Sequence, residues 1–402
     1  MANKPKIRFK GFDDAWEQRK LGDLVGIYDG VHQTPEYQDS GIMFLSVENI
    51  ATLKSEKYIS KEAFERDYKV YPEKGDILMT RIGDVGTTNV VETAKKVAFY
   101  VSLALLKPNG INSYFLSNAM KTNAFQKGLR ERTLVTAIPQ KINKDEIGKI
   151  DIFITNNDVE QQKIGAYFST LDHLITLHQR KCDQMKELKK YMLTKMFPQN
   201  GAKVPEIRFD GFIDDWEQRK LGDVCSRVQG NDGRMELPTL TISASNGWMK
   251  QEDRFSGNIA GKEQKNYTLL HKGELSYNHG NSKLAKYGTV FSLQSYEEAL
   301  VPRVYHSFKV EEGNTDFIEY YFATKLPDRE LGKLISSGAR MDGLLNIGYK
   351  EFMGIQLLFP KTKEQECIAN YFRNLDHLIT LHQHKCNELR EIKKYMLKNM
   401  FI

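Results

Sequence analysis

The nonapeptide LDHLITLHQ occurs twice in the chain, at Leu171 to Gln179 and at Leu375 to Gln383. Local propensity does not reproduce nine identical residues at two distant places, so the chain carries one structural device in two copies. A second repeated block pairs residues 7–24 with residues 207–224, where 14 of 18 aligned positions are identical. Between the repeated blocks the two halves diverge almost completely. We therefore expect one frame that holds two different inserts.

Each half is predicted to form a small α+β globule followed by one long helix. After a repeated WEQRKLGD segment come short runs of β-forming residues with Gly and Asn breaks, then an amphipathic helical region near Ser113 to Arg132 or near Asp316 to Ser336. The expected fold class is α+β, with two pseudo-two-fold-related globular domains separated by two long helices. The expected boundaries are residues 1–157 for the first globular domain, 158–198 for the central helix, 199–359 for the second globular domain and 360–402 for the C-terminal helix.

The two long helices carry matching apolar stripes. No Pro or run of Gly interrupts the 40 residues from Asp158 to Phe197, which would form a helix of roughly 60 Å at about 1.5 Å per residue. Apolar positions alternate in steps of three and four residues, the a/d pattern of a coiled-coil seam. The predicted seam residues are Ile164, Phe168, Leu171, Ile175, His178, Cys182 and Met185 in the first copy and Ile368, Phe372, Leu375, Ile379, His382, Cys386 and Leu389 in the second.

Two matching seams in one chain are buried most simply against each other. A two-fold axis perpendicular to the helices would make an antiparallel coiled coil and place the globules at opposite ends of a rod, whereas a parallel pair would place both at one end. We favour the antiparallel pair, because the tandem chain then mimics a symmetric dimer whose two heads differ. B-DNA repeats about every 34 to 36 Å, so such a chain suits a bipartite DNA site.

The composition permits a polyanionic partner without requiring one, since 58 basic residues face 52 acidic residues and the formal net charge is +6. The N-terminal segment lacks the apolar core of a secretory signal, and the longest apolar run, Val97 to Leu106, is too short to span a membrane. The cysteines Cys182, Cys225, Cys367 and Cys386 form no CxxC pair, which indicates free thiols. We expect a soluble cytoplasmic protein with no membrane partner.

Together these features resemble the specificity subunit of Type I restriction-modification enzymes. The resemblance rests on the twin WEQRKLGD segments, the LDHLITLHQ seams, the KKYML tails and the Glu-Gln pairs Glu160-Gln161 and Glu364-Gln365, and it covers essentially the full length. It implies a DNA-recognition subunit with two target-recognition domains, each of which reads one part of a split, asymmetric sequence. One departure concerns the proline that the family usually has before Glu-Gln: Pro360 fills this role in the second copy, and the first copy lacks it.

The resemblance also implies the partners. The paired helices would set the spacing of the DNA site and dock two modification (methyltransferase) subunits, and restriction subunits would join them for cleavage. The assembled complex would be a DNA adenine methyltransferase and endonuclease that binds double-stranded DNA. S-adenosylmethionine, ATP and Mg are expected on the partner subunits, and no cofactor is expected on this chain.

Polar, glycine-containing loops supply the candidate DNA contacts. The segments from Thr80 to Thr88 and from Ser276 to Gly288 occupy comparable places in the two halves, and the basic segment from Leu129 to Lys149 corresponds to Ser336 to Phe352. Arg, Lys, Asn, His and Thr are common partners of phosphates and base edges. The candidates are Arg81, Thr87, Thr88, Arg130 and Arg132 in the first half and Asn278, His279, Asn281, Lys283 and Arg340 in the second.

Repeated residues are weaker candidates, because an identical residue cannot distinguish two different half-sites. Trp16 and Trp216 are therefore interpreted as framework residues, and the arginines and lysines that follow them, Arg19, Lys20, Arg219 and Lys220, as residues that serve the fold or a partner subunit. His178 and Cys182, with His382 and Cys386, have the residue types of a tetrahedral zinc site. We favour seam residues that fix the helix register, and predict no metal.

The sequence contains no motif that would make the chain itself an enzyme. It has no GxxxxGK[ST] phosphate loop, no GxSxG nucleophile segment and no HExxH zinc motif. We assign no catalytic residue, and attribute methyl transfer and cleavage to the partners. Two alternatives remain at this stage: a DNA-modifying or cleaving enzyme with its catalytic site hidden in one globule, and a coiled-coil scaffold that does not bind DNA.

Overall fold

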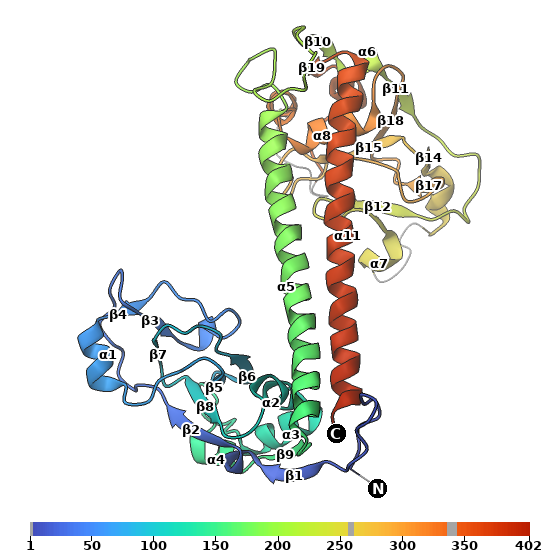
Figure 1. The fold of residues 1–402 in the computed structure, drawn as a ribbon. Helices are drawn as coiled ribbons and strands as arrows, with labels where there is room; N and C mark the ends of the chain where they lie inside the picture. The colour runs from blue at the N-terminus through green and yellow to red at the C-terminus, as the bar shows by residue number, and fades with distance from the viewer. Residues whose placement is uncertain (1–2, 256–260, 336–343) are drawn as a thin grey trace. The chain divides into compact units, whose positions relative to one another are not determined.

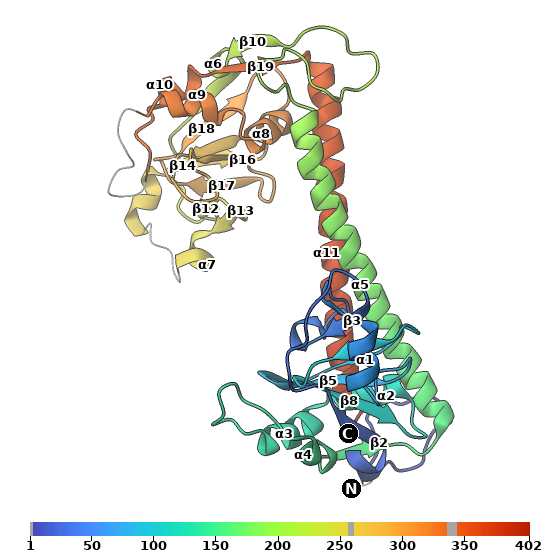
Figure 2. The ribbon, with the colours of Figure 1, turned by 90° about the vertical axis from the view of Figure 1, so that its left-hand side faces the viewer.

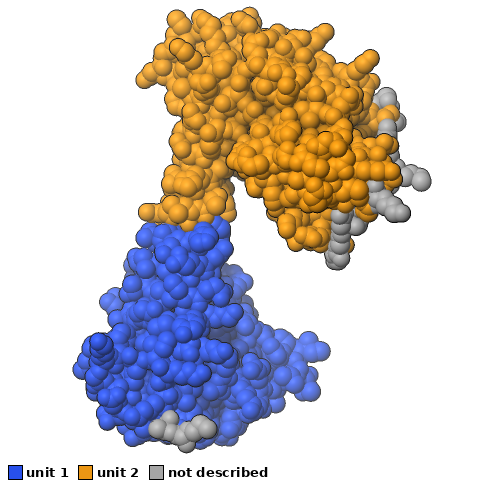
Figure 3. Space-filling model, turned by 90° about the vertical axis from the view of Figure 1, so that its right-hand side faces the viewer, with its two compact units in different colours: residues 1–179, 383–402 blue, residues 180–382 orange. Residues whose placement is uncertain are grey.

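The computed structural model describes residues 3–255, 261–335 and 344–402. The chain divides into two compact units, of which unit 1 comprises residues 1–179 and 383–402 and unit 2 comprises residues 180–382 (Figure 3). Each unit contains one globule, one half of helix α5 (Asp158–Lys195) and one half of helix α11 (Thr362–Met400) (Figure 1). The compact units therefore cut across both long helices, which the sequence analysis treated as separate segments.

The globule of unit 1 is built on an antiparallel sheet of order β2-β8-β5-β6, beside a small sheet β4-β3-β7 and a two-stranded ribbon β1-β9. Helices α2 to α4 pack on this framework. The strands are β1 (Glu17–Lys20), β2 (Val25–Asp29), β3 (Ile42–Leu45), β4 (Tyr58–Ile59), β5 (Ile77–Ile82), β6 (Asp84–Val90), β7 (Val97–Phe99), β8 (Leu103–Pro108) and β9 (Asp151–Ile154), and the helices are η1 (Leu21–Asp23), η2 (Val47–Asn49), α1 (Lys61–Asp67), α2 (Ser113–Ala119), α3 (Asn123–Arg132) and α4 (Lys144–Gly148).

The globule of unit 2 repeats the main sheet, in the order β11-β18-β15-β16, and the ribbon, as β10-β19. Two further ribbons, β12-β13 and β14-β17, complete it. The strands are β10 (Glu217–Lys220), β11 (Cys225–Val228), β12 (Leu240–Ser243), β13 (Gly247–Lys250), β14 (Thr268–His271), β15 (Leu275–Asn278), β16 (Thr289–Ser292), β17 (Glu298–Val301), β18 (His306–Val310) and β19 (Gln356–Phe359), and the helices are α6 (Leu221–Val224), α7 (Gln251–Phe255), η3 (Gly261–Asn266), α8 (Thr315–Ala323), α9 (Asp328–Lys333) and α10 (Tyr349–Met353).

The helical region predicted after each sheet is two helices rather than one. In unit 1, Thr122 separates α2 from α3, because its hydroxyl accepts the Phe125 N–H at 3.4 Å and caps a new helix. In unit 2, Lys325 has a φ of +66° and Pro327 follows it, so the chain turns between α8 and α9. A helical periodicity in sequence does not mark such a break unless the cap is recognised.

The repeated Arg-Phe and Glu-Gln segments fasten each long helix to its globule. In unit 1, Arg8 donates from Nε and Nη2 to the two carboxylate oxygens of the fully buried Glu160, at 2.5 and 2.9 Å. Arg208 and Glu364 form the same paired bonds in unit 2, both at 2.7 Å. Because both members of each pair are charged and satisfied, burial of the glutamate is tolerated. These identical residues therefore belong to the frame.

Helix α5 begins without the proline that the family usually has before Glu-Gln. Asn157 caps it instead, since its side-chain oxygen accepts the N–H groups of Val159 and Glu160 at 3.0 and 3.1 Å. Gln161 then donates to the Thr155 carbonyl oxygen at 2.8 Å, as Gln365 does to that of Pro360 at 2.9 Å. The departure from the family pattern leaves the start of α5 intact.

The long helices pair in antiparallel fashion within each unit. In unit 1, Lys393 forms an ion pair with Asp172, and in unit 2, Lys189 contacts both carboxylate oxygens of Asp376 at 2.6 and 2.7 Å. The Cys386 thiol lies 3.8 Å from the Ile175 carbonyl oxygen in unit 1. In each unit, positions early in one helix thus meet positions late in the other, as an antiparallel pair requires. The predicted direction is confirmed.

Most of the predicted seam is buried. Ile164, Phe168, Leu171 and Cys182 on α5, and their counterparts Ile368, Phe372, Leu375 and Cys386 on α11, are almost completely inaccessible, as is Leu389. Ile175, His178, Met185, Ile379 and His382 are half-buried. Among the described residues, no cluster of three or more His, Cys, Asp and Glu side chains is arranged to hold a metal ion.

The core of each globule includes the aromatic end of a long helix from the other repeat. In unit 1, Phe401 follows α11 and packs edge-on against Trp16, with ring centroids 5.7 Å apart. In unit 2, Phe197 follows α5 and packs in the same way against Trp216 at 5.9 Å. Both tryptophans are 2% exposed, which agrees with their interpretation as framework residues. In the described part of the chain, no helix is both long and apolar enough to cross a membrane.

The interhelical ion pair of unit 1 supplies a test of the antiparallel pairing. Asp172→Lys places a third cation near Lys393 and Lys121, and should lower the free energy of unfolding by about 1–2 kcal/mol. The double variant Asp172→Lys/Lys393→Asp restores opposite charges and should recover part of this loss in denaturant unfolding. Glu187→Lys, an exposed change on the same helix, is the control. A double variant no better than the sum of its single changes would contradict the pairing.

Candidate nucleic-acid interface

In unit 1 the turn between β5 and β6 is bonded to the segment that follows α3. Gly83 takes a φ of +82° in this turn, which favours glycine. Its N–H donates to the Gln140 carbonyl oxygen at 2.9 Å, and the Gln140 side chain donates back to the Gly83 carbonyl oxygen at 3.0 Å. The Ile142 N–H donates to the Arg81 carbonyl oxygen at 3.0 Å. The structure therefore joins the two first-half segments that were candidates for DNA contact.

Unit 2 contains the equivalent junction between the residues after β15 and the segment that precedes α10. The Leu345 N–H donates to the His279 carbonyl oxygen at 2.9 Å, and Gly280 and Leu344 form an antiparallel bridge. The corresponding bridge in unit 1 joins Ile82 and Lys141. The two units thus keep one backbone junction while the side chains that surround it differ. A conserved backbone with different side chains is what a protein that recognises two different sequences requires.

Three of the five first-half candidates are held by the fold. Arg81 is buried and forms an ion pair with Asp29, and burial lowers the pKa of its guanidinium. The hydroxyl of the buried Thr88 lies 3.0 Å from that of Ser117. Arg132 forms an ion pair with Glu146 at 3.2 Å. As placed, these side chains bond within unit 1 rather than reach outward.

The other two first-half candidates are exposed. Thr87 lies in β6, where its N–H donates to the Thr80 hydroxyl oxygen at 2.9 Å and its own side chain faces solvent. Arg130 lies in the last turn of α3 and is exposed. Lys141 and Lys144, which the sequence analysis did not single out, lie in the segment that follows α3 and are also exposed. These cations give the junction of unit 1 a positively charged rim.

In unit 2 the same division separates inner from outer candidates. His279 is buried, with Nδ1 2.7 Å from the Leu345 carbonyl oxygen and Nε2 2.9 Å from that of Val304. Asn278 donates to the Ile242 carbonyl oxygen at 3.2 Å and accepts the Gly280 N–H at 3.0 Å. Asn281 and Lys283 are exposed in the loop between β15 and β16. Arg340 lies outside the described residues.

Stacked rings hold the unit 2 junction in place. The rings of His279 and His306 are 5.0 Å apart and nearly parallel, and Tyr277 stacks on Phe352 at 4.3 Å. His306 Nε2 lies 2.8 Å from the Ile347 carbonyl oxygen. Burial lowers the pKa of His306 to about 4, and the neighbouring His279 and the guanidinium of Arg227 add smaller shifts in the same direction. His306 is therefore neutral at ordinary pH.

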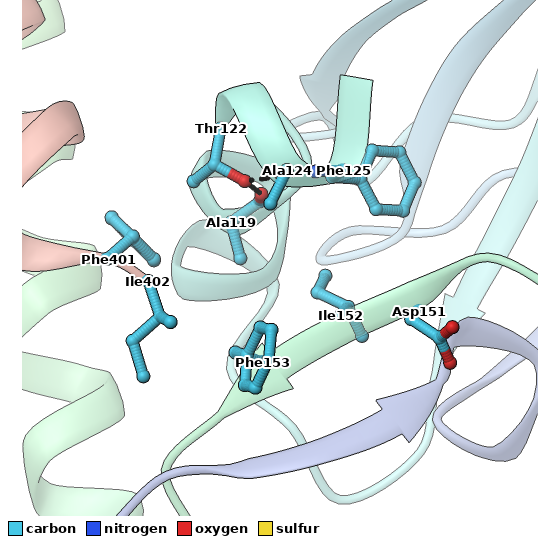
Figure 4. Close-up of a pocket in the computed structure, with 9 residues that line it drawn as sticks. All are labelled: Ala119, Thr122, Ala124, Phe125, Asp151, Ile152, Phe153, Phe401 and Ile402. Atoms are coloured by element: carbon cyan, nitrogen blue, oxygen red, sulfur yellow. Dashed lines mark hydrogen bonds between the residues drawn. The ribbon is translucent and has the colours of Figure 1, made fainter. Parts of the chain in front are cut away.

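Unit 1 also contains a basic groove of about 700 Å³ beside the end of α11. Its apolar lining comes from Leu397, Phe401 and Ile402, and its cations are Lys121, Arg390, Lys393, Lys394 and Lys398. Burial lowers the pKa of Lys121 to about 8, and the nearby Lys393 contributes to the same shift. An adjoining recess that Phe153, Phe401 and Ile402 help to line (Figure 4) offers only about 10 Å³, about the space of one water molecule.

Exposed apolar residues are the feature of this region that the sequence analysis missed. Leu134, Val135 and Ile138 lie in the loop between α3 and α4, which extends away from the rest of unit 1 (Figure 2). Tyr191 and Tyr395 occupy equivalent places on the two long helices, and both are exposed. Two features of the sequence could have indicated these residues. One is the apolar run LVTAI within a polar loop, and the other is the presence of a tyrosine at the same position in both repeats.

The chain has two globules built on the same repeated elements, and the loops at their junctions differ in sequence. This arrangement defines a protein with two tandem recognition domains for an extended target. Comparison with protein families identifies that class. The Type I restriction modification DNA specificity domain matches residues 13–187 and 213–391, so the chain belongs to this family. It is a DNA-recognition subunit of a Type I restriction-modification system, as its sequence features suggested, and the family is one of recognition rather than catalysis.

Two solved structures are similar to this chain. The S subunit of a Type I restriction-modification system from M. genitalium matches with 14% identity over 99% of both chains and a TM-score of 0.65. The HsdS subunit from Thermoanaerobacter tengcongensis matches with 15% identity over 96% of both chains and a TM-score of 0.41. A search of curated protein sequences finds no significant match. The first structure supports the α+β fold with paired long helices.

The neutral, half-buried His306 predicts a pH dependence of stability. Between about pH 6.5 and pH 4 the unfolded chain binds a proton that the folded chain does not, so acidification should destabilise unit 2, by up to about 3 kcal/mol. His306→Gln keeps an N–H donor for the Ile347 carbonyl oxygen but does not titrate. Its melting temperature should fall less than that of the native chain between pH 7 and pH 5. Equal shifts in the two proteins would refute this role for His306.

Proposed function

We propose that each unit reads one half of a bipartite, asymmetric DNA site. The observation that carries this proposal is the contrast between a repeated frame and divergent loops. The sheets β2-β8-β5-β6 and β11-β18-β15-β16 have equivalent strand orders. In both, the residues after the third strand, β5 or β15, form a β-bridge with a later segment, Ile82 with Lys141 and Gly280 with Leu344. The residues at the two junctions differ, so they suit two different DNA sequences. A catalytic globule or a scaffold that does not bind DNA would leave this contrast unexplained.

The exposed candidates are proposed to contact DNA, and the buried or half-buried candidates to position them. Arg130 and Lys283 suit phosphates or guanine edges, and Asn281 and Thr87 suit base edges. Arg81, Asn278 and His279 would act through the backbone junctions at which they lie, and Thr88 and Arg132 through the bonds that they form with α2 and α4. The backbone that presents each loop is then the same in both units, and the exposed side chains supply the specificity.

The long helices are proposed to dock two modification subunits. Tyr191 and Tyr395 are 53% and 59% exposed and are equivalent in the repeat, as are the exposed Leu177 and Leu381. An identical residue cannot discriminate between half-sites, and an exposed one adds little to the core. A partner that is present twice explains both properties. Tyrosine is also among the residues enriched at interface hot spots.

The lysines around the basic groove fit the same partner. Lys393 and Lys394 in unit 1 correspond to Lys189 and Lys190 in unit 2, so this charge is also repeated. Restriction subunits would join the assembly for cleavage, and the partners would bind S-adenosylmethionine, ATP and Mg. The assembled complex would methylate adenine and cleave DNA in the cytoplasm, where cellular DNA is accessible.

Methylation mapping tests the division of labour between the units. The chain is expressed with its modification subunit, and the methylated adenines are identified by sequencing. Exchange of residues 1–157 for those of another family member should change the base sequence of one half of a split motif and leave the base sequence of the other half unchanged. An exchange that leaves the motif unchanged, or that changes both halves, would overturn the assignment of one half-site to each unit.

The docking surface is tested by the double variant Tyr191→Ala/Tyr395→Ala. Loss of two exposed aromatic anchors should weaken binding of the modification subunit by about tenfold or more without lowering the melting temperature. Native mass spectrometry of mixed subunits reports the stoichiometry, which should fall from two modification subunits per chain. Val159→Ala is the matched control, because Val159 is exposed on α5 but its repeat counterpart is Lys363. Unchanged assembly of the double variant would exclude the tyrosines from the interface.

A further inference from the structure

The loop between α3 and α4 exposes apolar side chains at its tip. Ile138 is 100% exposed and Val135 is 68% exposed, and Leu134 precedes them with nearly half of its surface accessible. Single exposed apolar residues are common on soluble proteins. Three within five residues of one loop form a concentrated patch, which is the arrangement that marks interaction sites.

Hydrogen bonds hold this loop in a ribbon. The Leu134 N–H donates to the Lys141 carbonyl oxygen at 2.8 Å, and the Lys141 N–H donates back to the Leu134 carbonyl oxygen at 3.4 Å. The bonds between Gln140 and Gly83 then tie the ribbon to the β5-β6 turn. The tip is therefore presented from a fixed base, and its ordering cost is largely met before any partner binds.

The base of the ribbon is positively charged. Arg130, Lys141 and Lys144 are exposed, and none of the three has an ion pair within 4 Å among the described residues. The exposed acidic residues of this part of unit 1 are Asp145, Glu131, which is paired with Lys127, and Asp84 in the β5-β6 turn. An apolar tip above exposed cations suits a partner whose phosphates flank a surface with some apolar features, as the major groove of duplex DNA does with its thymine methyl groups.

Unit 2 shows a related arrangement at the same junction. In the loop between β15 and β16, Leu284 is exposed between the exposed residues Lys283 and Lys286. The two loops have no sequence in common, so the shared property is chemical. Both place an aliphatic side chain among cations at the junction, in unit 1 on the segment after α3 and in unit 2 on the loop between β15 and β16.

We propose that Ile138 and Val135 enter a groove of the duplex and read base edges by apolar contact. The inference rests on the proposed function of unit 1 and adds a specificity-determining role for two residues that carry no hydrogen-bonding group. The major groove admits a two-stranded ribbon, and there the thymine methyl group and the pyrimidine C5 edge are the apolar features that distinguish base pairs. Arg130 and Lys141 would hold the flanking phosphates.

The salt dependence of binding separates these two kinds of contact. An apolar contact releases no counterions, whereas each phosphate contact contributes about 0.9 to the slope of log affinity against log salt concentration. Loss of Ile138 should thus lower specific affinity without changing the slope. Loss of Arg130 should make the slope shallower by about 0.9 for every duplex.

The experiment uses the chain assembled with its modification subunit and two fluorescent duplexes, one that contains the methylation motif and one with the motif scrambled. Ile138→Ala should weaken binding to the motif duplex by about tenfold, since it removes three carbon atoms that would otherwise leave water on binding, and leave binding to the scrambled duplex unaffected. Ile213→Ala is the matched control, because Ile213 is 88% exposed outside the junction. It should change neither affinity.

Other outcomes would overturn either this proposal or the proposed function of unit 1. Unchanged affinity of Ile138→Ala for the motif duplex overturns the proposal, as does an equal loss for both duplexes. Fewer bound modification subunits in native mass spectrometry would show that the tip contacts protein, and would overturn it too. If the native assembly does not prefer the motif duplex, the proposed function itself fails, and this result is visible without any variant.

Discussion

Burial of an aromatic residue from the end of each long helix is the interaction on which the rest of the structure depends. Phe401 packs with Trp16 and Phe115 in unit 1, and Phe197 packs with Trp216 and Phe317 in unit 2. Each aromatic ring contributes roughly 2–3 kcal/mol when buried. Because each ring comes from the other repeat, neither globule completes its core alone. The antiparallel helix pair is therefore a condition of folding as well as a connection.

This dependence explains which residues the two repeats share. Arg8 with Glu160, and Arg208 with Glu364, fix a long helix to each globule through a buried, fully satisfied ion pair. Such a pair cannot lose one partner without leaving an uncompensated charge, so the frame tolerates little change. The loops at the two junctions have no such constraint. They are free to differ, and a subunit that recognises an asymmetric DNA sequence needs that difference.

The candidate DNA contacts show where sequence reasoning stops. Arg81 and His279 were chosen for their chemistry, yet Arg81 faces Asp29 and His279 bridges two backbone carbonyl groups. A sequence motif gives the residue type but not the direction of the side chain on a strand whose neighbours are distant in the chain. Ile138 was overlooked for the converse reason. An aliphatic residue is expected to be buried, and only the folded loop shows it fully exposed.

The sequence alone determined that the chain is duplicated, that each copy is an α+β globule with a long helix, and that the helices carry one continuous seam. Repetition and periodicity are local, one-dimensional properties, so they survive without coordinates. The antiparallel direction was favoured from the symmetry of the repeat and confirmed by the structure, whereas only the tertiary structure decided the exchange of Phe197 and Phe401 between repeats and the division of candidate contacts into buried and exposed. These properties depend on residues such as Asp172 and Lys393, which are far apart in the chain and adjacent only after folding.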